Sequence, residues 1–157
     1  MTTIGQNVNR PLPIGFLMGV THRKLTALFQ QGLHAYGITV EQWSALNQID
    51  CAQGLIQKEI ADRTGKDKPT VTRILDHLEK KGLIYKKPGE RDRRSFLVFS
   101  TELGRQVIAE TTPIEDRVTA EVKRCISEAE YDAMMELLVR IQQHIGDKLE
   151  HPDDSED

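Results

Sequence analysis

Residues 57–75, QKEIADRTGKDKPTVTRIL, contain the spacing that decides the fold. Gly65 follows Ala61 by four positions, Val71 follows six later, and Ile74 three after that. This spacing is typical of a helix-turn-helix. Alanine lets two helices cross closely, and glycine permits positive φ in the tight turn between them. The branched residues Val71 and Ile74 pack the second helix against the first. The alternative is an ordinary pair of packed helices with a polar outer face.

The second helix of this motif is expected to present a DNA-binding face. We expect Asp67 to cap it, with Pro69 in its first turn, and Gly82 to stop it. At 100° per residue, Pro69, Arg73 and Asp76 lie opposite the apolar stripe. Arginine and short hydroxyls suit base edges, whereas side chains at the N-terminal end can reach phosphates. The predicted DNA-binding residues of this helix are Lys68, Pro69, Thr70, Thr72, Arg73 and His77.

A β-hairpin is predicted directly after this helix. Residues 83–86 and 96–100 are rich in branched and aromatic side chains, as strands are, and residues 87–94 form a charged, turn-rich tip. Arginine exploits the negative potential of a narrow minor groove, and Asp92 is expected to hold an arginine in a charge-assisted pair. The predicted DNA-binding residues of this tip are Arg91, Asp92, Arg93 and Arg94. The alternative is a solvated turn that keeps a strand edge soluble.

Helices are expected on both sides of this region, at residues 14–36, about 102–125 and 128–150. A further helix is expected to begin after Thr39, with Gly54 ending the loop that follows it, and a short helix is expected at residues 57–64, where Gly65 breaks it. Thr39, with Gln42 three positions later, and Ser127 are the expected N-caps. The fold class is therefore mainly α with a small β-hairpin wing: a winged helix-turn-helix with flanking dimerisation helices. Residues 1–157 are expected to form a single domain, with 38–104 as the DNA-binding region. Residues 11–37 and 105–150 are the dimerisation helices, because they carry more apolar surface than the central region can cover, and 151–157 are an acidic tail.

Charge is segregated along the chain. Residues 57–100 carry 12 Lys or Arg and 7 Asp or Glu, so this segment is basic within a chain of net charge −3. A basic surface of this kind favours a nucleic-acid partner, although a solvated face is the simpler alternative. No run of apolar residues is long enough to cross a membrane, and the polar N-terminus lacks a secretory pattern. A cytoplasmic protein without a membrane partner is expected.

No enzyme, cofactor or metal motif is present in the sequence. It lacks a dinucleotide or phosphate-binding glycine motif, a nucleophile elbow and zinc spacing around its five histidines. Cys51 and Cys125 are expected to be small buried hydrophobes, with redox sensing through either of them as an alternative. A winged-helix protein-interaction module is the other alternative function.

Five segments of the sequence form a pattern that is specific as a whole: 57–61, 68–73, 78–84, 92–95 and 100–104. Together they resemble the MarR family of transcriptional regulators, and within it the branch typified by SlyA. The resemblance covers about residues 14–149. Thr64 departs from the apolar residue usual before the turn glycine. The resemblance implies a homodimer that binds a pseudo-palindromic operator in double-stranded DNA, with Arg94 in the minor groove, and is typical of a repressor relieved by a small aromatic or phenolic effector.

An effector site is expected where the dimerisation helices meet the winged helix. Trp43 and Tyr36 offer flat apolar walls, whereas His34 and Arg23 could bind a carboxylate or a phenol. The alternative is that Trp43 belongs to the core and that His34 and Tyr36 are surface residues.

Overall fold

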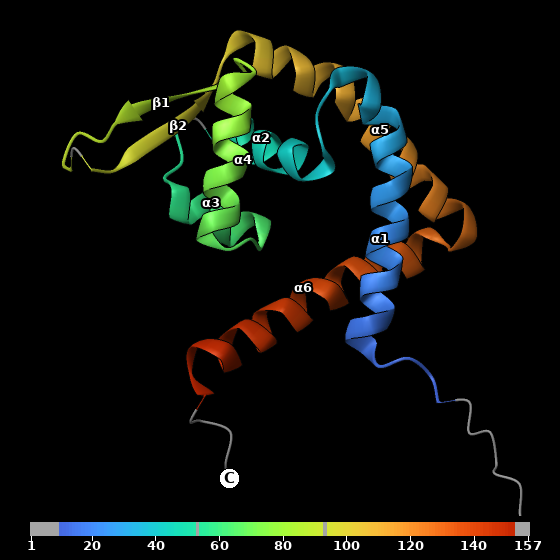
Figure 1. The fold of residues 1–157 in the computed structure, drawn as a ribbon. Helices are drawn as coiled ribbons and strands as arrows, with labels where there is room; N and C mark the ends of the chain where they lie inside the picture. Colours follow the sequence, from blue (N-terminus) through green and yellow to red (C-terminus); the bar gives the residue numbers. More distant parts are fainter. Residues whose placement is uncertain (1–9, 53, 93, 153–157) are drawn as a thin grey trace, which may run out of the picture. The chain divides into compact units, whose positions relative to one another are not determined.

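The computed structural model describes residues 10–52, 54–92 and 94–152, and its elements follow the predicted order (Figure 1). In these ranges the chain forms six α-helices, one short 3₁₀ helix and a two-stranded sheet. The predicted fold class, mainly α with a β-hairpin wing, is confirmed. Internal contacts divide the chain within helix α5 into two units, residues up to 115 and from 116 onward, and each is described by itself.

The first unit begins with two helices whose ends are set by local signals. Helix α1 spans Ile14–Leu33 and runs into the 3₁₀ helix η1, His34–Tyr36. Gly37, with φ of +64°, ends it in the left-handed region that glycine tolerates best. Helix α2 spans Val40–Ala52. Its predicted capping box is confirmed, because the Gln42 N–H donates to Thr39 Oγ1 and the Thr39 N–H donates to Gln42 Oε1, at 3.1 and 3.2 Å.

The core of the first unit is aliphatic and centred on α2, α3 and α4. Helix α3 spans Gln57–Thr64, the bounds predicted for it. Helix α4 spans Lys68–Lys80, so it begins directly after its predicted cap, Asp67, and ends two residues before the predicted stop at Gly82. The stripe predicted on α4 is buried: Val71, Ile74, Leu75 and Leu78. It packs with fully buried residues of the two preceding helices: Leu46, Ile49 and Ile60. Burial of this stripe leaves the opposite face of α4 in solvent.

The hairpin consists of β1, Ile84–Pro88, and β2, Phe96–Ser100, paired antiparallel with Ile84 opposite Ser100. In Figure 1 it extends beside α4. The first strand starts one residue later than predicted, because the Leu83 N–H donates to Leu78 O and completes the end of α4. Leu55, just before α3, forms two backbone hydrogen bonds with Val98 of β2, at 2.8 and 3.2 Å. The hairpin is thereby attached to the helix-turn-helix.

Helix α5 spans Glu102–Cys125, and helix α6, which belongs to the second unit, spans Glu128–Glu150, as predicted. The predicted N-cap of α6 is confirmed by the Glu130 N–H, which donates to Ser127 Oγ at 3.1 Å. The sequence of α6 has an apolar stripe at helical spacing, but the helix has no buried residue. The stripe consists of Met134, Leu137, Leu138, Ile141 and Ile145. Across the described ranges, no helix is long and apolar enough to span a membrane.

The prediction that both cysteines are buried is wrong, because Cys51 and Cys125 are exposed. Cys51 is two positions after buried Ile49, so it turns about 200° away from the buried stripe of α2. Cys125 is the last residue of α5, well beyond Ile114, the last buried residue of that helix. Their exposure removes one argument against a redox function, which stays a prediction.

Candidate nucleic-acid interface

The turn between α3 and α4 has the geometry of a helix-turn-helix. Gly65 adopts φ of +64°, and the Lys66 N–H donates to Ala61 O at 3.1 Å, which closes the end of α3. Asp67 then caps α4 by accepting a hydrogen bond from the Thr70 N–H at 2.8 Å. Hydrogen bonding from Thr70, first by its backbone and then by its side chain, lowers the pKa of the Asp67 carboxyl below its ordinary value of 3.8, and the charges of Arg73 and Lys66 act in the same direction.

The face of α4 opposite its buried stripe carries the residues predicted to bind DNA. Thr70 is half-buried, and the others are exposed: Lys68, Pro69, Thr72, Arg73 and His77. The helix has 13 residues, roughly three and a half turns, and is amphipathic. It therefore presents one continuous polar ridge of the width that enters a major groove.

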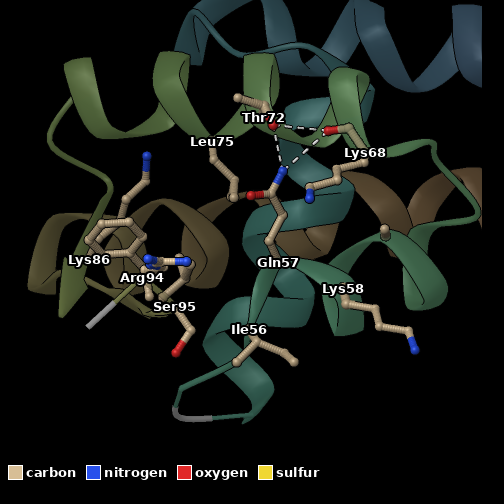
Figure 2. Close-up of a pocket in the computed structure, with 12 residues that line it drawn as sticks. Ile56, Gln57, Lys58, Lys68, Thr72, Leu75, Lys86, Arg94 and Ser95 are labelled. Atoms are coloured by element: carbon tan, nitrogen blue, oxygen red, sulfur yellow. Dashed lines mark hydrogen bonds between the residues drawn. The ribbon is translucent and has the colours of Figure 1, made fainter. Parts of the chain in front are cut away.

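Gln57, the first residue of α3, fastens α3 to the start of α4 (Figure 2). Its side-chain N–H₂ donates to Lys68 O at 3.2 Å and to Thr72 Oγ1. The Thr72 hydroxyl in turn donates to Lys68 O at 3.0 Å. Sequence reasoning missed Gln57, since a glutamine at a helix start carries no signal of its partner. The predicted base-contacting hydroxyl of Thr72 is therefore already held in place by two neighbours.

The tip of the wing is organised by Asp92, but in a different way from the prediction. Asp92 Oδ1 accepts the Arg94 backbone N–H at 2.9 Å, and Asp92 O accepts the Ser95 hydroxyl at 2.9 Å. Among the described residues no arginine side chain pairs with Asp92, and because Arg93 lies outside them, the predicted charge-assisted pair stays a prediction. An aspartate in a turn reaches its own backbone two residues on more readily than a mobile side chain. Arg91 and Arg94 are exposed, and Arg93 lies outside the described residues.

An open groove of about 600 Å³ lies between α3, α4 and the wing (Figure 2). Its floor is apolar and includes Leu75, Phe96 and Val98. Four cationic side chains line it: Lys58, Lys68, Lys86 and Arg94. The groove therefore joins the exposed ridge of α4 to the wing in one positively charged surface. Lys58 and Lys86 were not among the predicted site residues, although both lie in the basic segment of the sequence.

The predicted effector residues lie elsewhere in the first unit. Arg23, His34 and Tyr36 are exposed. Arg23 precedes His34 by eleven residues, roughly 16 Å along a helix, so the structure does not bring these two together. Trp43 is half-buried: its Nε1–H donates to Thr111 Oγ1 at 2.8 Å, and its ring meets Phe29 edge-on at 4.9 Å. None of the four lines the groove between α3, α4 and the wing.

The part of the chain that the structure describes holds no group of three His, Cys, Asp or Glu residues arranged to bind a metal ion. The chemistry of the groove is instead that of fixed positive charge, hydroxyls and backbone turns. Such a surface suits a phosphate polymer, whose charges it can follow along an edge. Fold and site together define the class: a winged helix-turn-helix, DNA-binding transcription regulator.

Comparison with known proteins finds similarity to one family of regulators. The MarR family model matches residues 38–96, which cover α2 to the start of β2. The chain is 26% identical to S. aureus MepR in its complex with DNA, over 85% of this chain and 99% of that one, with a TM-score of 0.76. It is 25% identical to wild-type MarR of E. coli in its apo form, over 84% and 98%, with a TM-score of 0.70. The chain is therefore similar to the MarR family over its winged helix, and to solved MarR-type regulators over most of its length.

One further solved structure has the same fold. It is BpsR of Bordetella bronchiseptica, described with the mechanism by which 6-hydroxynicotinic acid regulates its DNA binding. The chain is 24% identical to it, over 82% of this chain and 98% of that one, with a TM-score of 0.76.

Proposed function

We propose that this chain is a homodimeric, cytoplasmic repressor that binds a pseudo-palindromic operator and is released from it by a small aromatic ligand. The observation that carries the DNA-binding site is the continuous cationic surface formed by the exposed ridge of α4, the groove and the wing. Within this surface Arg73 reads base edges in the major groove, Lys68 and Thr70 bind phosphates, and Arg94 enters the minor groove.

Two substitutions test this division of roles on a duplex selected from a random pool. Arg73→Ala should weaken binding by about 1–3 kcal/mol and relax sequence choice, because a base contact is lost. Arg94→Ala should weaken binding mainly where the flanks are rich in A·T pairs. Arg124→Ala is the charge-matched control, since Arg124 is exposed on α5 outside the winged helix and pairs with Glu121. If both test variants bind the selected duplex like the control variant, the proposed site is wrong.

The homodimer is proposed from apolar surface left open in each unit. On α1, Ile14, Phe16 and Leu17 are exposed, with Phe16 reaching 69%. On α6, Leu137 and Ile145 of the apolar stripe are also exposed, at 47% and 50%. Apolar area of this extent is typical of an interface, and a second copy of the chain is the partner we propose.

Two-fold symmetry would then place two recognition helices in successive major grooves, with half-sites about 10 bp apart. Sedimentation at micromolar concentration should give a dimer. A stable, folded monomer would contradict the proposal.

The effector is proposed to act near the α1–α2 junction, where three of its four predicted residues lie: His34, Tyr36 and Trp43. Arg23, the fourth, lies roughly 16 Å from His34 along α1. The regulation of BpsR by 6-hydroxynicotinic acid supports an aromatic acid as the chemical class. Because the indole N–H of Trp43 is already bonded to Thr111, Trp43 would offer a ring wall and not a polar contact. A ligand need supply only the difference between its affinities for two states, typically about 1–3 kcal/mol.

Trp43 is the single tryptophan of the chain, so its fluorescence reports this region directly. Small aromatic acids such as salicylate should quench it and release DNA over the same concentration range. Quenching without DNA release would leave a binding pocket without a switch, and no change in either signal across a broad set would contradict the effector proposal.

A further inference from the structure

Lys86 on the wing forms ion pairs with two carboxylates of the recognition helix. Its Nζ lies 3.2 Å from Asp76 Oδ1 and 3.8 Å from Glu79 Oε1. The Lys86 side chain is 25% exposed, whereas those of Asp76 and Glu79 are 53% and 47% exposed. Figure 2 shows Lys86 beside Arg94 on the wing side of the groove. The lysine is therefore partly covered and faces α4, while its two partners border solvent.

The position of Asp76 makes this pairing matter for DNA binding. Asp76 lies three residues after Arg73 on the exposed ridge of α4, so its carboxylate belongs to the face proposed to meet DNA. A carboxylate on that face repels phosphates, and Glu79, one turn further on, adds a second negative charge. One ammonium between the two offsets part of this repulsion and also joins β1 to α4.

We propose that Lys86 is a positioning residue: it holds the wing against the recognition helix and neutralises Asp76 and Glu79, without binding a phosphate itself. This inference rests on the DNA-binding function proposed above. Strand alternation supports it, because Lys86 shares a face with buried Ile84 and so points toward the helices.

Lys87 provides the matched control. It is the next residue on β1 and lies on the opposite face, where its ammonium sits 5.6 Å from the Tyr85 ring centre and 5.3 Å from the Phe99 ring centre. No carboxylate pairs with Lys87 among the described residues. Lys86→Gln and Lys87→Gln therefore remove the same charge from neighbouring positions, but only the first leaves carboxylates without their cation.

The test is a double-mutant cycle on affinity for one selected duplex at fixed salt. Lys86→Gln should weaken binding about tenfold or more in the wild-type chain, because two unscreened carboxylates then face phosphates. In the Asp76→Asn, Glu79→Gln background the same substitution should cost about threefold or less, close to the effect of Lys87→Gln in either background. An equal loss in both backgrounds, or a loss no larger than that of Lys87→Gln, would overturn the proposal.

A second measurement separates neutralising the carboxylates from binding a phosphate. In the Asp76→Asn, Glu79→Gln chain, Lys86→Gln should leave the slope of log affinity against log salt unchanged, because Lys86 binds no phosphate. A slope shallower by about 0.9 would mean that Lys86 binds a phosphate, contrary to the proposal. If the wild-type chain selects no duplex at all, the proposed function fails, which is distinct from either of these results.

Discussion

Gly104→Ala should destabilise the protein, because Gly104 lies where α5 passes closest to the base of the wing. A Cβ built there would stand 2.1 Å from Leu83 O and 3.3 Å from Leu46 Cδ1. Leu83 O cannot easily move, since it accepts the Thr101 N–H at 3.0 Å. Overpacking against a fixed backbone atom costs about 3 kcal/mol, and the better helix propensity of alanine offsets about 1 kcal/mol of this. We expect a net loss of about 2 kcal/mol in the free energy of unfolding.

Gly146→Ala on α6 is the matched control, because nothing lies within 4 Å of the Cβ it would add. It should raise the free energy of unfolding by about 0.5–1 kcal/mol, the ordinary gain from replacing a helical glycine. Urea unfolding followed by circular dichroism, at one fixed protein concentration, measures both variants. A Gly104→Ala protein as stable as the wild type would refute the close approach of α5 to Leu83.

Two further predictions concern the ends of α4 and α2. Because the pKa of Asp67 is lowered, its ionised form stabilises the folded state above about pH 3.8, and this contribution is lost as the pH falls through the folded pKa. The difference in free energy of unfolding between wild type and Asp67→Ala should therefore shrink below about pH 3.8, as measured by acid unfolding curves. Trp43→Phe leaves buried Thr111 without the indole donor, so it should lower the free energy of unfolding by about 1–2 kcal/mol in urea unfolding. An unchanged midpoint would show that the indole hydrogen bond contributes nothing.

The helix bounds could be predicted because their determinants are local. Asp67 and Ser127 cap with their own side chains, and Gly37, Gly65 and Gly82 end their elements with positive φ. Each signal acts within about four residues, so it can be recognised without knowing what packs against the helix.

The site was predicted less completely, because its parts meet across elements. The bond from Gln57 to Thr72 joins residues 15 apart, and the pairing of Lys86 with Asp76 depends on how the hairpin docks on α4. Strand alternation could have indicated that Lys86 faces inward with Ile84. The hydrogen bond from the Arg94 N–H to Asp92 could also have been predicted from the sequence, since aspartate in a turn commonly accepts a backbone N–H two residues on.

The burial of the cysteines was predicted wrongly for a related reason. Residue type favours burial for cysteine, but the helical position of Cys51 turns it away from the stripe formed by Leu46 and Ile49. Position on a helix face decides burial more directly than average preference does, and the stripe was already visible in the sequence.

The most direct test of the central claim is the salt dependence of affinity for a duplex selected from a random pool, compared with a scrambled duplex. A cationic surface running from α4 through the groove to the wing predicts that log affinity falls steeply with log salt on both duplexes, despite the net charge of −3. Base contacts from Arg73 predict, in addition, that the selected duplex binds at least about 10³-fold more tightly than the scrambled one. A flat salt dependence, or no preference for any sequence, would contradict the account.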